Sequence, residues 1–106
     1  GSLQVAPGVD LVDTEAFPAE IKAGALAARA VRNSLQSNGA DLDWSYLSPA
    51  AILQPGERTG QFRVGSTELL MSGDQPASIS VADLAVAILD EIEHPQHLQK
   101  QFTVAY

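Results

Sequence analysis

The sequence predicts an α/β fold that looks like the second half of a doubly wound sheet, formed as one domain over residues 1–106. Two segments of helical character, 18–38 and 80–94, each precede a segment with strand character, 42–48 and 101–105. A strand, a helix and another strand in this order can form a crossover in a parallel sheet. A hydrophobic fraction of 45% with 18% charged residues also excludes an intrinsically disordered chain.

The composition limits the function classes further. A net charge of −7 opposes phosphate backbones, so we expect no nucleic-acid partner. The sequence has no cysteine, which excludes disulfides and thiol nucleophiles and fits a reducing compartment, so a cytoplasmic location is expected. No run of about 18 apolar residues is present, so we expect no membrane partner.

The first third of the chain predicts a turn and a long helix. Leu3–Leu11 is apolar and is interrupted by Pro7-Gly8, which indicates a strand end followed by a turn. The helix is expected to begin near Pro18, because proline is tolerated in a first helical turn. It is expected to end at Asn38-Gly39, because asparagine and glycine both accept the left-handed conformation that closes a helix. Its apolar stripe is predicted to pack closely on a sheet and consists of Ile21, Ala25, Ala28 and Leu35.

The middle of the chain predicts strands. Leu42–Ser48 alternates and contains two aromatic residues, and Pro49 is expected to end that strand. Gln61–Val64 and Glu68–Met71 are predicted to form a small hairpin, and a further turn is expected at Gly73–Pro76.

The second helix carries the clearest local signal. Ser80 is predicted to cap it, with Asp83 three residues later as an acidic variant of the capping box, and Pro95 prevents its continuation. This second helix has a repeating apolar face that is expected to join the core and consists of Val81, Leu84, Ala85, Ile88 and Ile92. After the helix, residues 101–105 are predicted to form a terminal strand.

Simple sequence motifs do not define a catalytic or metal site. The dinucleotide-binding pattern of a strand, G-x-G-x-x-G and a helix is absent, and Gly56–Gly60 is better explained as a turn. His94 and His97 lie near two glutamates, but Pro95 separates them and three converging ligands are not evident, so no metal is predicted. Lys22 stands alone in an apolar helical turn, where its stem can cover apolar surface.

Several segments together resemble the C-terminal half of atypical short-chain dehydrogenase/reductases, within the NAD(P)H-binding, NmrA-like group that includes NADH-flavin reductase-like proteins. The resemblance covers nearly the whole chain. It is carried by LDWSYLSPAA (42–51), PGERTG (55–60), ISVADLA (79–85), HPQH (94–97) and FTVAY (102–106).

The resemblance implies a partial Rossmann-like sheet that lacks its N-terminal dinucleotide-binding half, since family members are about twice this length. Ser2 matches a serine that often faces the nicotinamide, although Gly1-Ser2 also matches the remnant of a protease site. Lys22 matches the lysine of the family's tyrosine-lysine pair, but Ile21 replaces the tyrosine and removes the phenol that would donate a proton. In a full-length protein, the cofactor and substrate side of the pocket would be lined by Leu47, Ser48, Pro49, Ala50 and Ala51.

The sequence thus leads to two hypotheses. The first is the substrate-side C-terminal portion of an NAD(P)H-dependent oxidoreductase, with NAD(P)H as the family's cofactor and no cofactor bound by this chain alone. The alternative is a stand-alone, non-enzymatic module that binds a small molecule or assembles with itself. In either case the strand around Trp44 and Tyr46 is expected to lie at an open sheet edge, which favours a homodimer or another homo-oligomer.

Overall fold

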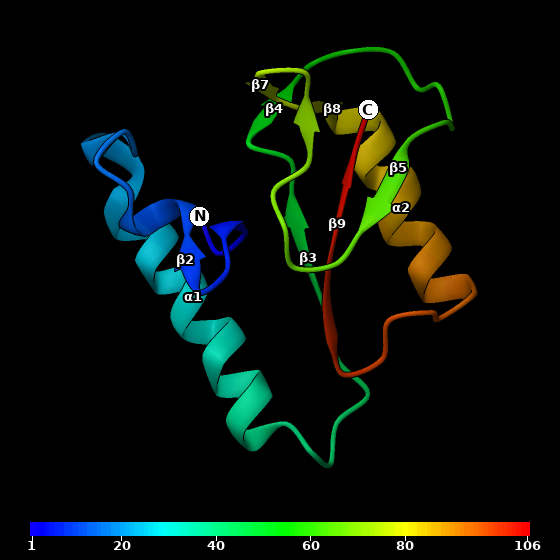
Figure 1. Ribbon diagram of the computed structural model, residues 1–106. Helices are drawn as coiled ribbons and strands as arrows, with labels where there is room; N and C mark the ends of the chain where they lie inside the picture. The colour runs from blue at the N-terminus through cyan, green and yellow to red at the C-terminus, as the bar shows by residue number, and fades with distance from the viewer.

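The computed structural model describes residues 1–106 and shows a mixed α/β fold of two helices and several small sheets (Figure 1). The largest sheet has the order β3-β9-β5. β3 (Ser45–Pro49) runs parallel to β9 (Lys100–Ala105), and β5 (Arg63–Gly65) pairs antiparallel with the other edge of β9. The predicted parallel relationship between the strand near 42–48 and the terminal strand is therefore confirmed.

The boundaries of β3 differ from the prediction at both ends. The strand begins at Ser45 rather than Leu42, and it includes Pro49, which lies opposite Val104 of β9. A proline removes one backbone donor, and this loss is tolerated in a strand that has a neighbour on only one side. β3 is such a strand, because it stands at one end of the three-stranded sheet.

The predicted hairpin of 61–64 with 68–71 is wrong. β5 pairs with the distant β9, whereas β6 (Met71–Ser72) forms the hairpin with β7 (Gln75–Pro76). The turn of that hairpin contains Gly73 with φ 63°, a conformation that glycine adopts without strain. The glycine between the two segments favoured a local hairpin, but the first segment, which contains β5, pairs with the distant β9 instead.

Two further strand pairs flank the main sheet. β1 (Gln4–Ala6) and β2 (Val9–Asp10) form an antiparallel hairpin around Gly8, so the predicted turn at Pro7-Gly8 is confirmed. A short 3₁₀ helix, η1 (Leu11–Asp13), follows β2. Elsewhere, β4 (Ile52–Gln54) pairs in parallel with β8 (Ser78–Ser80).

Helix α1 (Ala19–Asn38) begins and ends close to the predicted residues, but its end is built differently. Gly39 has φ −91°, which is not left-handed, and its N–H donates to the carbonyl of Leu35. Glycine is needed here for another reason. A Cβ atom at position 39 would lie 2.4 Å from the Leu35 carbonyl oxygen and 2.7 Å from Nε1 of Trp44.

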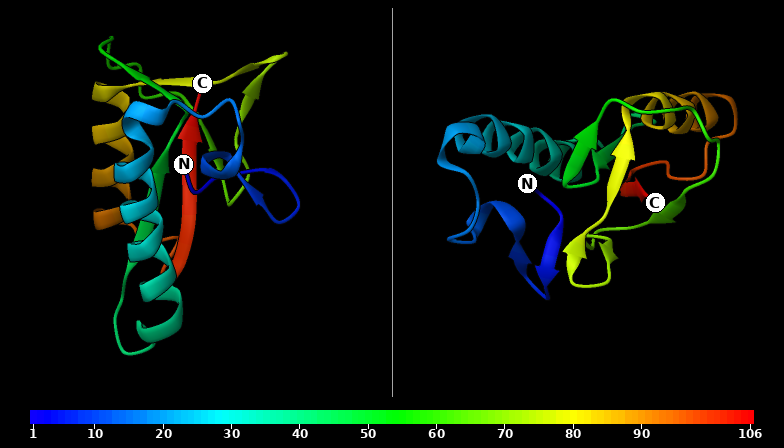
Figure 2. Two further views of the ribbon diagram at one scale, coloured as in Figure 1. Left: turned by 90° about the vertical axis from the view of Figure 1, so that its left-hand side faces the viewer. Right: turned by 90° about the horizontal axis from the view of Figure 1, so that it is seen from above.

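The apolar stripe of α1 is not buried, contrary to the prediction that it packs closely on the sheet. None of the residues of α1 is buried, and Ile21 and Val31 are more than half exposed. Figures 1 and 2 show why: α1 lies beyond the outer edge of β3, on the side away from β9. The helix touches the sheet through the Tyr46 hydroxyl, which donates to the carbonyl of Ala28 at 2.8 Å.

Helix α2 (Val81–Glu93) has the predicted cap, since the N–H of Asp83 donates to the hydroxyl of Ser80 at 2.9 Å. Its buried residues are Asp83 and Ala87, however, rather than the predicted apolar face. Ile88 and Ile92 are 45% and 69% exposed. The apolar face of α2 is consequently only partly used by this chain.

The core lies between α2 and one face of the main sheet. Ala87 belongs to a buried cluster with Phe102 and Val104 of β9, while α1 reaches Tyr46 and Gln101. Because alternate residues of a strand point to opposite faces, α1 and α2 contact opposite faces of the sheet. The full cluster consists of Ala50, Ala77, Ile79, Ala87, Phe102, Val104 and Ala105.

Candidate functional site

A cavity of about 530 Å³ opens at the carboxyl end of β3. Pro49, the last residue of β3, and Ala50 and Ala51 after it form one wall. Phe17 and the first turns of α1 form the opposite wall. The remaining lining residues are Gly1, Leu3, Leu11, Glu20, Ile21, Gly24, Ala25, Leu53 and Leu69.

Small residues leave this cavity open. Ala50 and Ala51 project little side chain into it, and a Cβ atom at Gly24 would meet no atom within 4 Å. Glu20 is the one charged residue among the lining side chains. A mostly apolar cavity with a single carboxylate suits the apolar part of a small ligand, and its lining contains no hydroxyl, thiol, imidazole or lysine side chain.

A buried polar cluster lies beside the cavity. The hydroxyl groups of Ser2 and Ser48 are 3.2 Å apart, and the amide nitrogen of Gln101 donates to both hydroxyl oxygens, at 3.2 and 3.0 Å. Arg32 of α1 donates to the carbonyl oxygen of Ser2 at 3.0 Å. The cluster therefore joins the N-terminal segment, α1, β3 and β9 at one point.

Charged pairs hold the N-terminal segment against α1. Arg29 bonds to Asp13 at 2.6 Å and to Asp10 at 3.3 Å, and Arg32 reaches Asp10 at 3.5 Å. The hydrogen bond from Arg29, with a smaller contribution from the charge of Lys22, holds the pKa of Asp13 below its usual range. Because η1 and Leu11 form part of the cavity wall, these pairs also support its shape.

The residues named from the resemblance are divided among three environments. Pro49, Ala50 and Ala51 line the cavity, whereas Ser2 and Ser48 lie in the buried polar cluster next to it. Lys22 is exposed on α1 and does not line the cavity, while Ile21 beside it does. Leu47 points to the opposite face of the sheet and lines a different cavity.

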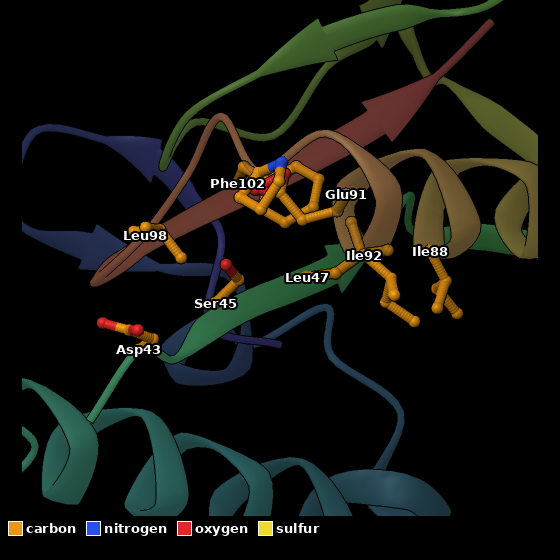
Figure 3. A pocket seen from close by; sticks show the side chains of 9 residues that line it. Asp43, Ser45, Leu47, Ile88, Glu91, Ile92, Leu98 and Phe102 are labelled. Atoms are coloured by element: carbon orange, nitrogen blue, oxygen red, sulfur yellow. The ribbon is translucent and has the colours of Figure 1, made fainter.

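That second cavity also has a volume of about 530 Å³ and lies between β3 and α2 (Figure 3). Ile88 and Ile92 project from α2 toward it, and Leu47 and Ser45 come from β3. Its other lining residues are Asp43, Glu91, Pro95, Leu98 and Phe102.

The carboxylate of Glu91, at the wall of the second cavity, already has hydrogen-bond partners within the chain. Its carboxylate accepts from the backbone N–H groups of Gln96 and His97 and lies 3.1 Å from Nδ1 of His97. Burial would raise the pKa of Glu91, but these hydrogen bonds outweigh it and lower the pKa. The His97 ring stacks on Phe102 with a centroid distance of 4.1 Å. Glu91 and His97 thus close the end of α2, and no group of three or more potential metal ligands occurs in the chain.

Asp83 organises a third polar site, at the start of α2. This buried carboxylate accepts hydrogen bonds from the N–H groups of Thr59 and Gly60, both at 2.9 Å, from the Thr59 hydroxyl at 2.6 Å and from the Tyr106 hydroxyl. Burial would raise the pKa of Asp83, but the hydrogen bonds hold it well below its usual range. The segment 55–60 and the end of the chain are thereby fixed to α2.

Sequence reasoning missed several of these residues. It treated Asp83 only as part of a helix cap, and it did not single out Arg32, Gln101 or Tyr106. A buried carboxylate needs donors from outside its own helix, and Thr59 and Tyr106 lie 24 and 23 residues away. Local patterns carry no signal at that separation, but the segments PGERTG, ISVADLA and FTVAY that carry the resemblance contain Thr59, Asp83 and Tyr106.

Comparisons with known proteins find a curated relative that matches most of the chain and solved structures that match nearly all of it. No family model matches the sequence. The uncharacterised protein YwnB of Bacillus subtilis (strain 168) is 39% identical over 95 residues, which is 89% of this chain and 44% of that protein. The chain thus spans less than half the length of this curated relative.

Three solved structures superimpose closely on the chain. A "putative exported protein" of Burkholderia pseudomallei has a TM-score of 0.93 and 47% identity, covering 100% of this chain and 51% of that protein. A "putative epimerase" of Bacteroides thetaiotaomicron has a TM-score of 0.89 and 40% identity, and the match covers 100% of this chain and 49% of that protein. A "putative NADH-flavin reductase" of Streptococcus pneumoniae TIGR4 has a TM-score of 0.90 and 29% identity, and the match covers 99% of this chain and 51% of that protein.

The chain therefore has the fold of about one half of NADH-flavin reductase-like and epimerase-like proteins. No helix in it is both long enough and apolar enough to cross a membrane.

Proposed function

We propose that the chain is the C-terminal, substrate-side portion of an NAD(P)H-dependent oxidoreductase of the atypical short-chain dehydrogenase/reductase type, similar to NADH-flavin reductases. The observation that carries the proposal is the match of 99% of the chain to half of the Streptococcus pneumoniae protein, with a TM-score of 0.90. The cavity of Pro49, Ala50 and Ala51 is the part that receives the substrate.

The residues present do not fit the diphosphate of a dinucleotide. Gly56 and Gly60 are followed by strand β5, not by a helix whose N–H groups could bind phosphate. The start of α2 carries the carboxylate of Asp83, and the first turn of α1 carries Glu20, so both helix N-termini repel an anion. The chain alone consequently does not hold NAD(P)H, and a partner half is needed to supply that site.

The role of the cavity follows from its lining. Pro49 ends β3 and fixes the direction of the chain, so Ala50 and Ala51 present small apolar surfaces toward α1. Such a surface favours a flat, apolar ring system over a highly charged substrate. The buried polar cluster of Ser2, Ser48 and Gln101 fixes the wall from behind.

A chimaeric protein tests this role. The matched half of the Burkholderia pseudomallei protein is replaced by this chain, and NADH or NADPH oxidation is followed with FMN and riboflavin as probes. We expect turnover in the chimaera, and its loss in a chimaera with Ala51→Trp, because the indole fills the cavity. Lys100→Ala, at an exposed position away from the cavity, is the control. Equal turnover with Ala51→Trp in a folded chimaera, or no turnover in a folded chimaera that binds NADPH, would contradict the proposed function.

A further inference from the structure

Glu20 places a single negative charge at the cavity that opens at the carboxyl end of β3. Its side chain is the one polar side chain in the lining, because every other lining residue is hydrophobic, glycine or proline. Glu20 lies in the first turn of α1, where the helix dipole favours a carboxylate. That preference accounts for an acidic residue at this position of the helix, but it does not require the residue to line an apolar cavity.

No cation of the chain neutralises Glu20. The ion pairs of the chain use Asp10, Asp13 and Glu91 as their acidic partners. Lys22, two residues further along α1, is exposed, does not line the cavity and contributes its charge to Asp13. No lysine or arginine side chain is among the lining residues. The charge of Glu20 is therefore available to a ligand.

The cavity has the size and the walls of a site for a flat ring system. Its volume of about 530 Å³ lies within the range of about 300–1,000 Å³ that is typical of small-molecule sites. Ala50 and Ala51 form one wall, Phe17 lies in the opposite wall, and Gly24 adds no side chain to the space between them. Glu20 is exposed at present, so water reaches its carboxylate. A ring that enters the cavity displaces part of this water.

The displaced water decides which ligands bind well. Removing water from a carboxylate is unfavourable unless a hydrogen-bond donor or an opposite charge replaces it. A neutral hydrocarbon ring leaves the carboxylate of Glu20 without a partner, and an anionic ring adds repulsion. A ring that carries a protonated nitrogen supplies both the charge and the N–H donor, and hydrogen bonds of this kind are the stronger ones.

We infer that the cavity binds a flat, fused aromatic compound with a protonated nitrogen whose N–H group donates to the carboxylate of Glu20. The inference names the class of substrate for the cavity, and it rests on the proposed function in taking the cavity as the substrate site. The apolar walls bind the ring, and Glu20 selects its charge. Glu20 is thus a specificity-determining residue.

Binding of three fluorescent probes with three fused rings tests the inference. They are 9-aminoacridine, which is a cation with N–H donors at pH 7, neutral acridone, and the anion anthracene-9-carboxylate. Each is titrated into the 106-residue chain with Gly1 acetylated, because Gly1 also lines the cavity and its amino group would add a charge there. We expect 9-aminoacridine to bind at least about tenfold more tightly than anthracene-9-carboxylate, with acridone between them.

Three variants locate the effect. Glu20→Gln should weaken binding of 9-aminoacridine about tenfold and leave acridone nearly unchanged, because it removes the charge and keeps the size of the side chain. Glu93→Gln removes the same charge at an exposed position at the end of α2, away from the cavity, and should leave all three affinities unchanged. Ala51→Trp should weaken all three probes, because the indole fills the cavity. Circular dichroism checks that each variant is folded.

Each outcome supports or overturns the inference. Equal losses with Glu20→Gln and Glu93→Gln would show a general attraction of cations to an acidic chain and would overturn it. Binding of 9-aminoacridine that survives Ala51→Trp, or no saturable binding to the folded chain, overturns it as well. The expected preference in the chain, together with a folded chimaera that binds NADPH but has no turnover, overturns the proposed function and keeps the binding preference. A chimaera that turns over FMN and riboflavin, while the chain shows no preference for the cation, keeps the proposed function and overturns the inference.

Discussion

The hydroxyl of Tyr106, the last residue of the chain, donates a hydrogen bond to the buried carboxylate of Asp83 in the first turn of α2. The same hydroxyl lies 2.9 Å from that of Ser80, which caps the helix. Thr59 and Gly60 complete the donors around Asp83. One carboxylate thus joins the start of α2, the segment 55–60 and the end of β9.

We predict that the free energy of unfolding falls as the pH is lowered below the ordinary aspartate range near 3.9, and that Asp83→Asn reduces this dependence. The pKa of Asp83 is lowered in the folded protein, so its stabilising effect is complete above the unfolded-state pKa and is lost as the pH falls toward the folded-state value. Urea unfolding at pH 7 and pH 3 measures the effect.

Tyr106→Phe serves as the matched control for that measurement. It removes one donor but leaves the donors from Thr59 and Gly60, so we expect a smaller loss of stability than with Asp83→Asn. The interpretation fails if Asp83→Asn unfolds with the same pH dependence as the unmodified chain.

For α2, we predict that Ser80→Ala destabilises the chain by about 0.5–2 kcal/mol through loss of the cap. Leu84→Ala should cost about 2 kcal/mol, because Leu84 packs on the core while remaining partly exposed. Ile88→Ala should cost less than about 1 kcal/mol in the isolated chain, because Ile88 is largely exposed. Chemical denaturation of the three variants measures the loss in free energy of unfolding for each. A larger loss for Ile88→Ala than for Leu84→Ala would contradict the observed packing.

The polar cluster behind the cavity gives another prediction. Gln101→Leu removes the donor shared by Ser2 and Ser48 and leaves their buried hydroxyl groups with fewer partners. We expect a loss of about 1–3 kcal/mol in the free energy of unfolding. Gln99→Leu is not a suitable control, because Gln99 also bonds to the backbone. Gln36→Leu, on the exposed side of α1, should have little effect, and an equal loss in both variants would count against a specific role for the cluster.

We also predict that the isolated chain self-associates at micromolar concentration, because the outer edge of β3 has no neighbouring strand and the side chains of Ile88 and Ile92 are exposed to water. Sedimentation equilibrium should show a homodimer or a higher oligomer, and Ile92→Lys should shift the equilibrium toward monomer. Trp44→Glu is a poorer probe, because Trp44 packs against Gly39 and its replacement would also disturb the end of α1. A well-folded monomer over the whole concentration range would contradict this prediction.

Local signals predicted the parts of the fold that depend on neighbouring residues. The cap at Ser80, the beginning of α1 after Pro18 and the turn at Gly8 each need only a few adjacent residues, and all three are found. The pairing of β5 with β9 joins residues about 40 positions apart, and the sequence offered a nearer partner instead. Periodicity predicted an apolar face of α2 of which only Leu84 packs on the core, because Ala87 takes the buried position while Ile88 and Ile92 stay exposed in this chain.

The candidate site was predictable to a similar degree. The resemblance singled out Pro49, Ala50 and Ala51, and these three are among the residues that line the cavity. It did not separate them from Leu47, which the alternation of β3 directs to the other face of the sheet. Arg32 and Gln101 were not identified, because their contact with Ser2 depends on the packing of α1 and β9.

The central claim is tested most directly by calorimetric titration of NADPH and NADH into the isolated chain and into the chimaera that joins it to the other half of the Burkholderia pseudomallei protein. We predict no saturable heat with the isolated chain and saturable binding with the chimaera, because we propose that the dinucleotide site lies in the other half. Micromolar saturation of the isolated chain, or a folded chimaera that binds neither nucleotide, would contradict it.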